Sequence, residues 1–341
     1  MIYYRPVVMT DPAARPAGAL TLAGGWCWFE RLERIERGCG RRIVAPDEVP
    51  EDVIDRLTRP RAAIAGIAMD APRLMGILNV TPDSFSDGGR YLDPGAALER
   101  ARAMAGAGAD FIDIGGESTR PGAETVPDAD ETARTQPVIA ALRQGGLPAP
   151  VSIDTRKAAV AGAALDAGAA MVNDVSALAH DPALAGLVAG RGVPVCLMHA
   201  QGDPKTMQQD PRYDDVLLDV YDHLAARIAA AEAAGIAWGR IVVDPGIGFG
   251  KTAAHNLALL RGLSLFHGLG CPILLGASRK RFIGLIGGGA AETQADLRGP
   301  GTVAVTLGAL AQGVQIHRVH DIVEIKQALR LWQAVTFGEK A

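Results

Sequence analysis

The stretch LMGILNVTPDSFSDGGRYLDPGAALERARAMAGAGADFIDIGG (residues 74–116) contains one complete unit of the predicted fold. It begins and ends with short apolar runs, LMGILNV and DFIDIGG, which are typical of strands buried on both faces. Between them, Asp93 and Pro94 suit a helix N-cap followed by proline at the first helical position, and AALERARAMAGAG supplies the helix. Strand, helix and strand in this order are the repeating unit of a parallel α/β sheet.

The same alternation continues to the C-terminus. Further apolar runs lie at 150–155, 170–175, 194–200, 241–246, 272–278 and 314–320, and Ala-rich helical segments separate them. Thr155 and Asp321 are predicted to cap two of these helices. Eight strands, each followed by a helix, predict an α/β protein of the (β/α)8 TIM barrel type over residues 74–341, with an open doubly wound sheet as the alternative.

Residues 1–73 do not share this alternation and are expected to form an N-terminal extension, either a small subdomain or a cap packed on the barrel. A helical pattern is present in PEDVIDRLTRP (50–60). The basic run of Arg37, Arg41 and Arg42 is expected to face solvent, as such runs usually do. The sequence does not reveal a role for this extension.

The composition excludes several classes of protein. The chain has 341 residues, of which 48% are hydrophobic, and this is enough apolar surface for one large core. A formal net charge of −4 argues against a protein that binds duplex nucleic acid. Four scattered cysteines, no apolar signal-peptide region and no run of about 18 apolar residues predict a cytoplasmic protein with reduced thiols.

Polar side chains collect at the C-terminal ends of the predicted strands. They are Asn79, Asp113, Asp154, Asn173, His199, Asp244, Ser278 and Arg318. Since the interior of such a strand is apolar, polar groups gathered at one end predict a shared functional rim. Asp154, Asn173 and Asp244 would suit a ligand that presents adjacent N–H donors, such as an aminopyrimidine edge.

Three loops on this rim, and the end of the last predicted strand, carry further indications of function. The loops NVTPDSFSDGGRYLDP and GGESTRPGAETVP are long enough to close over a substrate. DPGIGFGKT (244–252) is not a nucleotide-binding Walker loop, because Pro245 stands where that pattern requires glycine, so its glycines are predicted to turn the backbone tightly behind Asp244. His317 and His320 would lie on opposite faces of a strand, which disfavours a two-histidine metal site.

Seven motifs in unbroken order resemble those of the dihydropteroate synthase family: MGILNVTPDSFSDGG, IDIGGESTRPGAE, VSIDT, NDVSAL, DPGIGFGK, GASRKRFIG and RVHD. The resemblance covers roughly residues 74–335. It implies a transferase of folate biosynthesis that joins 6-hydroxymethyl-7,8-dihydropterin diphosphate to p-aminobenzoate and releases pyrophosphate. It also implies dependence on Mg²⁺, inhibition by sulfonamides and a homodimer.

The same resemblance implies a role for each matching residue. The pterin-binding positions are Asp154, Asn173, Asp244, Phe249, Lys280 and Arg318. The pyrophosphate positions are Asn79, Thr119, Arg318 and His320, with Asn79 also at the metal. The p-aminobenzoate positions are Phe85, Thr119, Pro121, Ser278 and Lys280. The catalytic positions are Asp87, Arg120, Lys280, Arg318 and His320, and Asp87 is the loop acid that would support a cationic intermediate.

Two other functions fit part of this pattern. A pterin-binding methyltransferase barrel shares the Asp, Asn and DPG arrangement, but one-carbon transfer expels no pyrophosphate and does not account for TPDSFSDGG, STRPG and SRK. A non-catalytic pterin-binding paralogue is the second alternative. Intact Asp87, Arg120, Lys280 and His320 disfavour it.

Overall fold

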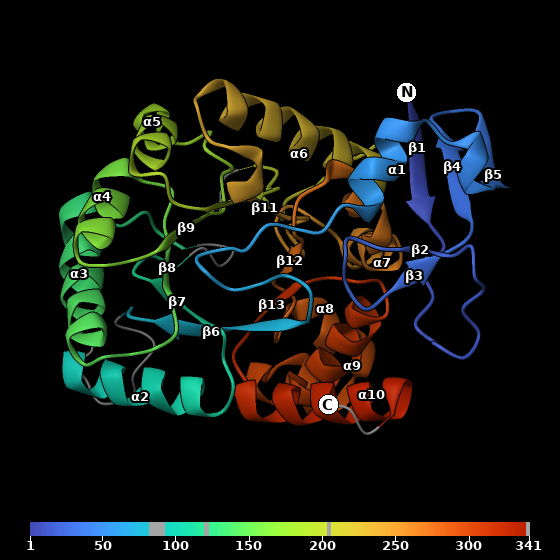
Figure 1. Cartoon of the computed structure of the whole chain (residues 1–341). Coiled ribbons are helices and arrows are strands. Elements are labelled where there is room, and N and C mark those ends of the chain that lie inside the picture. The colour runs from blue at the N-terminus through green and yellow to red at the C-terminus, as the bar shows by residue number, and fades with distance from the viewer. Residues whose placement is uncertain (82–92, 119–122, 203–205, 339–341) are drawn as a thin grey trace.

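Eight parallel strands form a closed barrel in the computed structural model, which describes residues 1–81, 93–118, 123–202 and 206–338 (Figure 1). The strands are β6 (Arg73–Asn79), β7 (Phe111–Gly115), β8 (Val151–Asp154), β9 (Met171–Asp174), β10 (Val195–Met198), β11 (Ile241–Asp244), β12 (Leu274–Leu275) and β13 (Ile316–Val319). Their order is β11-β10-β9-β8-β7-β6-β13-β12, and a parallel bridge between Val243 and Ile273 joins the two ends. The predicted TIM barrel is confirmed, and the open sheet is wrong.

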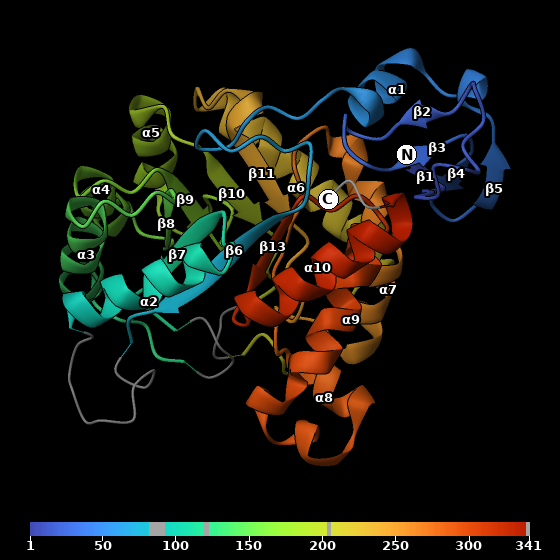
Figure 2. The same ribbon diagram turned by 60° about the horizontal axis from the view of Figure 1, so that its bottom comes forward.

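Helices surround these strands on the outside, as Figures 1 and 2 show. They are α2 (Pro94–Gly106), α3 (Asp128–Gln144), α4 (Ala158–Asp166), α5 (Pro182–Arg191), α6 (Val216–Ala233), α7 (Ala253–Arg261), α8 (Arg281–Gly287), α9 (Gly299–Leu310) and α10 (Ile322–Phe337). A short 3₁₀ segment, η4 (Leu263–Leu269), follows α7. This arrangement brings the C-terminal ends of all eight strands to one mouth of the barrel.

The predicted helix caps are only partly right. Asp93 caps α2, because its carboxylate accepts a hydrogen bond of 3.0 Å from the backbone N–H of Ala96. Thr155 does not cap α4; the N–H of Ala158 donates instead to Asp181, at 2.8 Å, so the cap comes from a residue distant in sequence. Asp321 stands at the start of α10 but makes no capping bond, because the Arg279 guanidinium engages its carboxylate and a charged donor binds it more strongly.

The barrel interior has an apolar lower layer. Its buried side chains are Ile64, Met69, Met75, Phe111, Met171, Cys196, Val242, Leu274 and Ile316. Ile64 and Met69 belong to the segment before β6, where Ile64 pairs with Ile67 in a short antiparallel bridge. Since the strands are buried on both faces, a larger cluster of apolar residues fills the space between the strands and the helices.

The N-terminal module (residues 1–58) lies outside the ring of helices, shown in blue in Figures 1 and 2. It contains β1 (Ile2–Pro6), β2 (Leu20–Thr21), β3 (Trp28–Phe29), β4 (Leu32–Glu36), β5 (Gly40–Val44), η1 (Pro46–Glu48) and α1 (Glu51–Thr58). β1, β4 and β5 form an antiparallel sheet, and β2 pairs with β3. The module has a small core of its own, which includes Leu22, Phe29 and Leu32.

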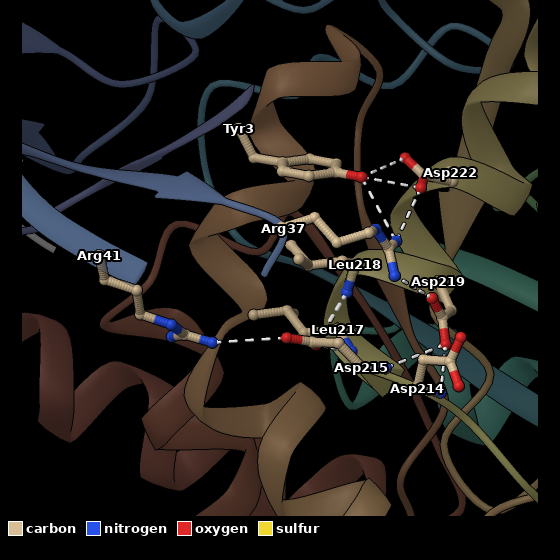
Figure 3. Close-up of polar contacts among 9 residues, drawn as sticks. All are labelled: Tyr3, Arg37, Arg41, Asp214, Asp215, Leu217, Leu218, Asp219 and Asp222. Carbon is tan, nitrogen blue, oxygen red and sulfur yellow. Dashed lines mark hydrogen bonds and ion pairs between the residues drawn. The ribbon is translucent and has the colours of Figure 1, made fainter. Parts of the chain in front are cut away.

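The module is docked on α6 through charged groups (Figure 3). Arg37 contacts two carboxylates of α6, Asp219 at 2.6 Å and Asp222 at 2.8 Å. Arg41 lies 3.7 Å from Asp215. The expectation that the whole basic run faces solvent is therefore wrong for Arg37, because the carboxylates that neutralise it belong to a helix about 180 residues later in the sequence.

Two further observations bear on the whole chain. None of the described helices is long and apolar enough to cross a membrane. All four cysteines are free thiols, and burial raises the pKa of Cys27 and of Cys271 to about 12, so both stay protonated at neutral pH.

Ile64 seals the lower end of the barrel and is fully buried, so its truncation should leave a cavity. We expect Ile64→Ala to lower the free energy of unfolding by about 2–5 kcal/mol, as measured by chemical denaturation. Val335→Ala is the control, because Val335 is 79% exposed on α10 and its loss should change stability by about 0.5 kcal/mol or less. Equal stability of the two variants would contradict the role given to Ile64.

Candidate active site

A polar layer sits directly above the apolar layer of the barrel. Side chains two residues apart on a strand face the same side, so the strands that bury Phe111, Met171, Val242 and Ile316 also point their next inward residues into the barrel. Those residues are Asp113, Asn173, Asp244 and Arg318. Asp154 joins them, since it pairs with Asn173 in the ladder between β8 and β9. The predicted gathering of polar groups at one mouth therefore has a physical origin in the strand register.

Arg318 is the centre of this layer. Its Nε donates to Asp113 Oδ2 at 2.6 Å, and its Nη2 donates to Asp154 Oδ2 at 2.7 Å. Burial opposes its charge, but Asp113 and Asp154 hold the pKa of the guanidinium above its ordinary value. Arg318 therefore stays charged and fixes two carboxylates that come from different strands.

The carboxylates keep unused acceptor capacity. Asp113 Oδ2 also accepts from Asn173 Nδ2 at 3.1 Å, but Asp113 Oδ1 and Asp154 Oδ1 are buried and accept no hydrogen bond from any described residue. Buried polar groups are normally hydrogen-bonded, and exceptions concentrate at functional sites. The two oxygens can accept N–H donors from a ligand.

Burial raises the pKa values of two of the acids. The pKa of Asp154 is raised to about 7 by burial, although Arg318 opposes the shift. The pKa of Asp244 is raised to about 6 by burial, against the hydrogen bond from the N–H of Gly246 and the charge of Lys280. Both carboxyl groups can thus change protonation state near neutral pH, which is common for groups at functional sites.

The loop after β11 is shaped by its glycines. Gly246 has a φ of +68°, donates its N–H to Asp244 Oδ1 at 2.7 Å, and a Cβ there would lie 1.8 Å from the carbonyl oxygen of His199. Gly250 has a φ of +62°, and a Cβ would lie 2.3 Å from the carbonyl oxygen of Gln201. The predicted tight turn behind Asp244 is confirmed, because only glycine fits these positions.

Two lysines flank this loop. Lys280 places its Nζ 4.0 Å from the ring centroid of Phe249, a cation–π contact. Lys251 is buried below the loop, where its Nζ contacts His199 Nδ1 at 2.8 Å and the carbonyl oxygen of Phe249 at 3.0 Å. Burial lowers the pKa of Lys251 to about 7 and keeps His199 neutral by lowering its pKa, so Nδ1 of His199 can accept from the amine. Lys251 therefore ties the glycine loop to the end of β10.

The mouth between β6, β12 and β13 holds the remaining described candidates. Ser278 Oγ lies 3.0 Å from Nδ1 of His320, and the N–H of His320 donates to the same oxygen at 3.2 Å. The amide oxygen of Asn79 lies on the rim beside Gly115, 3.3 Å from where a Cβ of that glycine would stand. No group of three or more His, Cys, Asp or Glu in the described part of the chain could hold a metal. Carbonyl oxygens suit Mg²⁺, and phosphate groups of a substrate can supply further oxygen ligands, so the amide oxygen of Asn79 fits as one ligand of such an ion.

Five predicted site residues cannot be compared with this geometry. Phe85, Asp87, Thr119, Arg120 and Pro121 lie outside the described residues. Both ends of the loop after β7 are described. Lys157 Nζ donates to the carboxylate of Glu117 at one end of this loop and to the carbonyl oxygen of Val126 at the other. It also donates to Glu131 Oε2 in α3, at 2.6 Å. One buried lysine thus holds both ends of this loop against α4.

Sequence reasoning placed Asp113 and His199 on the predicted rim without giving either a role, and it missed Lys251 as a residue of the site. A carboxylate inside the apolar run FIDIG was a usable signal for Asp113, since burial of a charge needs a partner. Lys251 was considered only as a Walker lysine, and its burial beneath the loop has no signature in the sequence.

Comparisons with known proteins point to one family. The family described as "Pterin binding enzyme" matches residues 75–320. Dihydropteroate synthase of Neisseria meningitidis serogroup C is 46% identical over 272 residues, which are 79% of this chain and 94% of that protein. The matched family region begins after the N-terminal module.

Solved structures give the same result. A Xanthomonas albilineans dihydropteroate synthase with 4-aminobenzoic acid has a TM-score of 0.75 and 46% identity, covering 82% of this chain and 98% of that one. A dihydropteroate synthase from Xanthomonas albilineans in complex with 7,8-dihydropteroate has a TM-score of 0.72 and 43% identity, covering 82% of this chain and 99% of that one. Yersinia pestis dihydropteroate synthase in a sulfonamide drug complex has a TM-score of 0.74 and 45% identity, covering 79% and 96%.

The raised pKa values of Asp154 and Asp244 predict a pH-dependent stability. Between about pH 4 and pH 7 the folded protein keeps protons that the unfolded chain has released, so the free energy of unfolding should fall as the pH rises. Each carboxyl group contributes at most about 1.4 kcal/mol per pH unit to this slope. Chemical denaturation across this range should show a shallower slope for Asp154→Asn than for wild type. Identical slopes for Asp154→Asn and wild type would refute the assignment.

Proposed function

Since the chain belongs to the dihydropteroate synthase family, we propose that its barrel mouth carries out the family reaction with the residues described above. The enzyme is a transferase that joins 6-hydroxymethyl-7,8-dihydropterin diphosphate to p-aminobenzoate, giving 7,8-dihydropteroate and pyrophosphate. The observation that carries the assignment is the pair of buried carboxylates, Asp113 and Asp154, that Arg318 binds. One oxygen of each carboxylate accepts no hydrogen bond from any described residue.

The pterin binds in the polar layer. Its pyrimidine edge presents adjacent N–H groups, and the unused carboxylate oxygens of Asp113 and Asp154, together with Asp244, are acceptors for such groups. Asn173 adds an amide that can donate and accept. Gly276 borders the same layer, since a Cβ there would lie 3.6 Å from Asp244 Oδ2 and 4.0 Å from Arg318 Cδ. Phe249 and Lys280, which come from the loops after β11 and β12, contact each other beside this layer.

The diphosphate binds at the rim. Arg318 and His320 come from the end of β13 and Asn79 from the end of the neighbouring β6, so cationic and polar groups meet where the leaving group would lie. Asn79 would hold Mg²⁺, which when bound neutralises charge on the departing pyrophosphate. His320 is oriented by Ser278, whose hydroxyl contacts both its ring nitrogen and its backbone N–H.

The acceptor attacks from the loop side. Departure of pyrophosphate leaves a methylene cation that the electron-rich pterin stabilises, and the weakly basic arylamine attacks it, so no covalent enzyme nucleophile is needed. Ser278 and Lys280 are proposed to contact p-aminobenzoate, with Phe85, Thr119 and Pro121 completing its pocket. Asp87 and Arg120 are proposed to support the cation and the leaving group. The homodimer that the resemblance implies and the cytoplasmic location that the sequence composition predicts both stay predictions.

A pyrophosphate-release assay tests the reaction itself. Pyrophosphate should appear with the pterin diphosphate, p-aminobenzoate and Mg²⁺ together, and chelation of Mg²⁺ should abolish its release, because the leaving group then keeps its charge. A sulfonamide should compete with p-aminobenzoate, since its aryl amine suits the same pocket. Binding of the pterin without turnover would favour the non-catalytic paralogue, and methyl transfer to a folate would favour the methyltransferase barrel.

Arg318→Lys tests the residue at the centre of the site. Lysine keeps the charge but cannot bridge Asp113 and Asp154 with a planar fork, so kcat/KM for the pterin diphosphate should fall at least about tenfold, or ~1.4 kcal/mol. Arg5→Lys is a matched control, because Arg5 pairs with Glu33 inside the N-terminal module. Steady-state kinetics with circular dichroism as a fold check decides the result. A change of about twofold or less in Arg318→Lys is what an exposed ion pair would give and would remove the assignment.

A further inference from the structure

The N-terminal module contacts the barrel at the start of the helix that leads out of the active-site face. Arg37 Nη1 donates to Asp219 Oδ1 at 2.6 Å, and Arg37 Nη2 donates to Asp222 Oδ2 at 2.8 Å, as Figure 3 shows. The hydroxyl of Tyr3, itself buried, lies 2.8 Å from Asp222 Oδ2. The Tyr3 ring also packs edge-on against Tyr221, with 5.5 Å between the ring centroids. The guanidinium fork therefore holds two carboxylates one helical turn apart.

Asp219 connects this contact to the backbone that enters α6. While its Oδ1 accepts from Arg37, its Oδ2 accepts the backbone N–H of Asp214 at 3.0 Å and of Asp215 at 3.2 Å. Asp215 in turn caps α6 by accepting from the N–H of Leu217 at 3.0 Å. Arg37 thus orients the carboxylate that sets the path of the chain just before the helix.

That chain segment lies on the glycine loop of the site. The hydroxyl of Tyr213 donates to the carbonyl oxygen of Gly250 at 2.8 Å. Nε2 of Gln208 donates to the carbonyl oxygen of Gly248 at 2.6 Å. Gly248 in turn lies against Lys280, whose Cδ would be 3.1 Å from a Cβ at that glycine. Residues 206–213 therefore hold the backbone of the glycine loop through two hydrogen bonds. The same loop carries Phe249, and its Gly246 N–H donates to Asp244.

A second route joins the same surfaces. The residue after Asp222 is His223, whose ring meets that of His199 edge-on, with 4.7 Å between the ring centroids. His199 Nδ1 holds Lys251 at 2.8 Å, and Lys251 Nζ donates to the carbonyl oxygen of Phe249. The face of α6 that binds the module and the face that backs the glycine loop are adjacent on one helix.

We propose that the N-terminal module is a brace for the pterin site and that Arg37 is its positioning residue, acting through Asp219 and Tyr213 on the glycine loop 245–250. This inference rests on the proposed function only in taking that loop as part of the pterin site. The module lies outside the region that the family model matches, so the brace is a feature added to the barrel of this chain. Arg37 touches no substrate; it sets where Asp244, Phe249 and Lys280 stand.

Arg37→Gln tests the brace, with Arg5→Gln as the matched control. Arg5 forms an ion pair of 2.7 Å with Glu33 within the module, and among the described residues no ion pair joins it to α6, so its loss should leave both kcat and KM unchanged. In Arg37→Gln the KM for the pterin diphosphate should rise about 3- to 10-fold, which lies within the range that mutations along a coupled network produce, while kcat changes less. Arg37→Lys keeps the charge without the fork, so it should show a smaller rise. Measurements are made well below the melting temperature of each variant.

Hydrogen exchange gives a readout that a merely stabilising contact would not move. In Arg37→Gln, the amides of Asp214 and Asp215 and those of residues 246–250 should exchange faster than in Arg5→Gln. Tyr213→Phe removes the hydroxyl that reaches Gly250, so adding Arg37→Gln to it should raise KM by less than Arg37→Gln alone does. A lowered melting temperature with unchanged KM and unchanged exchange in residues 246–250 overturns the brace. If wild type releases no pyrophosphate, the proposed function fails, and the exchange comparison still decides the brace.

Discussion

The ion pairs between Arg318 and the carboxylates of Asp113 and Asp154 are the interaction on which the site depends. A buried carboxylate is costly unless a charge or a donor satisfies it, and two of them side by side repel each other. Arg318 relieves both costs, yet one oxygen of each acid stays without a donor among the described residues. The ion pairs therefore stabilise the buried carboxylates, and the two oxygens without a donor stay available to a ligand with N–H groups.

The barrel makes this arrangement possible because it brings strands from the whole chain to one place. Asp113 lies on β7, Asp154 on β8 and Arg318 on β13, about 200 residues from Asp113, yet the closed ring sets all three above one apolar floor. Closure and register decide which residues face inward, since a shift by one residue would turn every one of these side chains toward the helices. The dry floor also strengthens the electrostatic interactions above it.

Loops on the same mouth depend on backbone conformations and buried charges. Glycines at 246 and 250 let the loop after β11 approach the backbone at His199 and Gln201, and Lys251 holds that loop from below. Lys157 does the same for the ends of the loop after β7. The N-terminal module meets the remaining support of the site, α6, through Arg37. Lys157 and Arg37 are distant in sequence from the groups that they hold, whereas Lys251 directly follows its loop and reaches His199, which is distant in sequence.

The sequence by itself determined the barrel, the strand positions to within a few residues and the glycine turn, because apolar periodicity and turn chemistry are local properties. It also placed Asp154, Asn173, Asp244 and Arg318 at one mouth of the barrel, since polar residues that end apolar barrel strands share that end, and their roles in binding stay predictions. The tertiary structure alone decided which charges pair: Asp113 with Arg318, Asp321 with Arg279 instead of with its own helix, and Arg37 with α6 instead of with water. The pairing of charges depends on which groups, distant in sequence, the fold brings together in its interior, where the dielectric constant is low. No local pattern of residues carries that information.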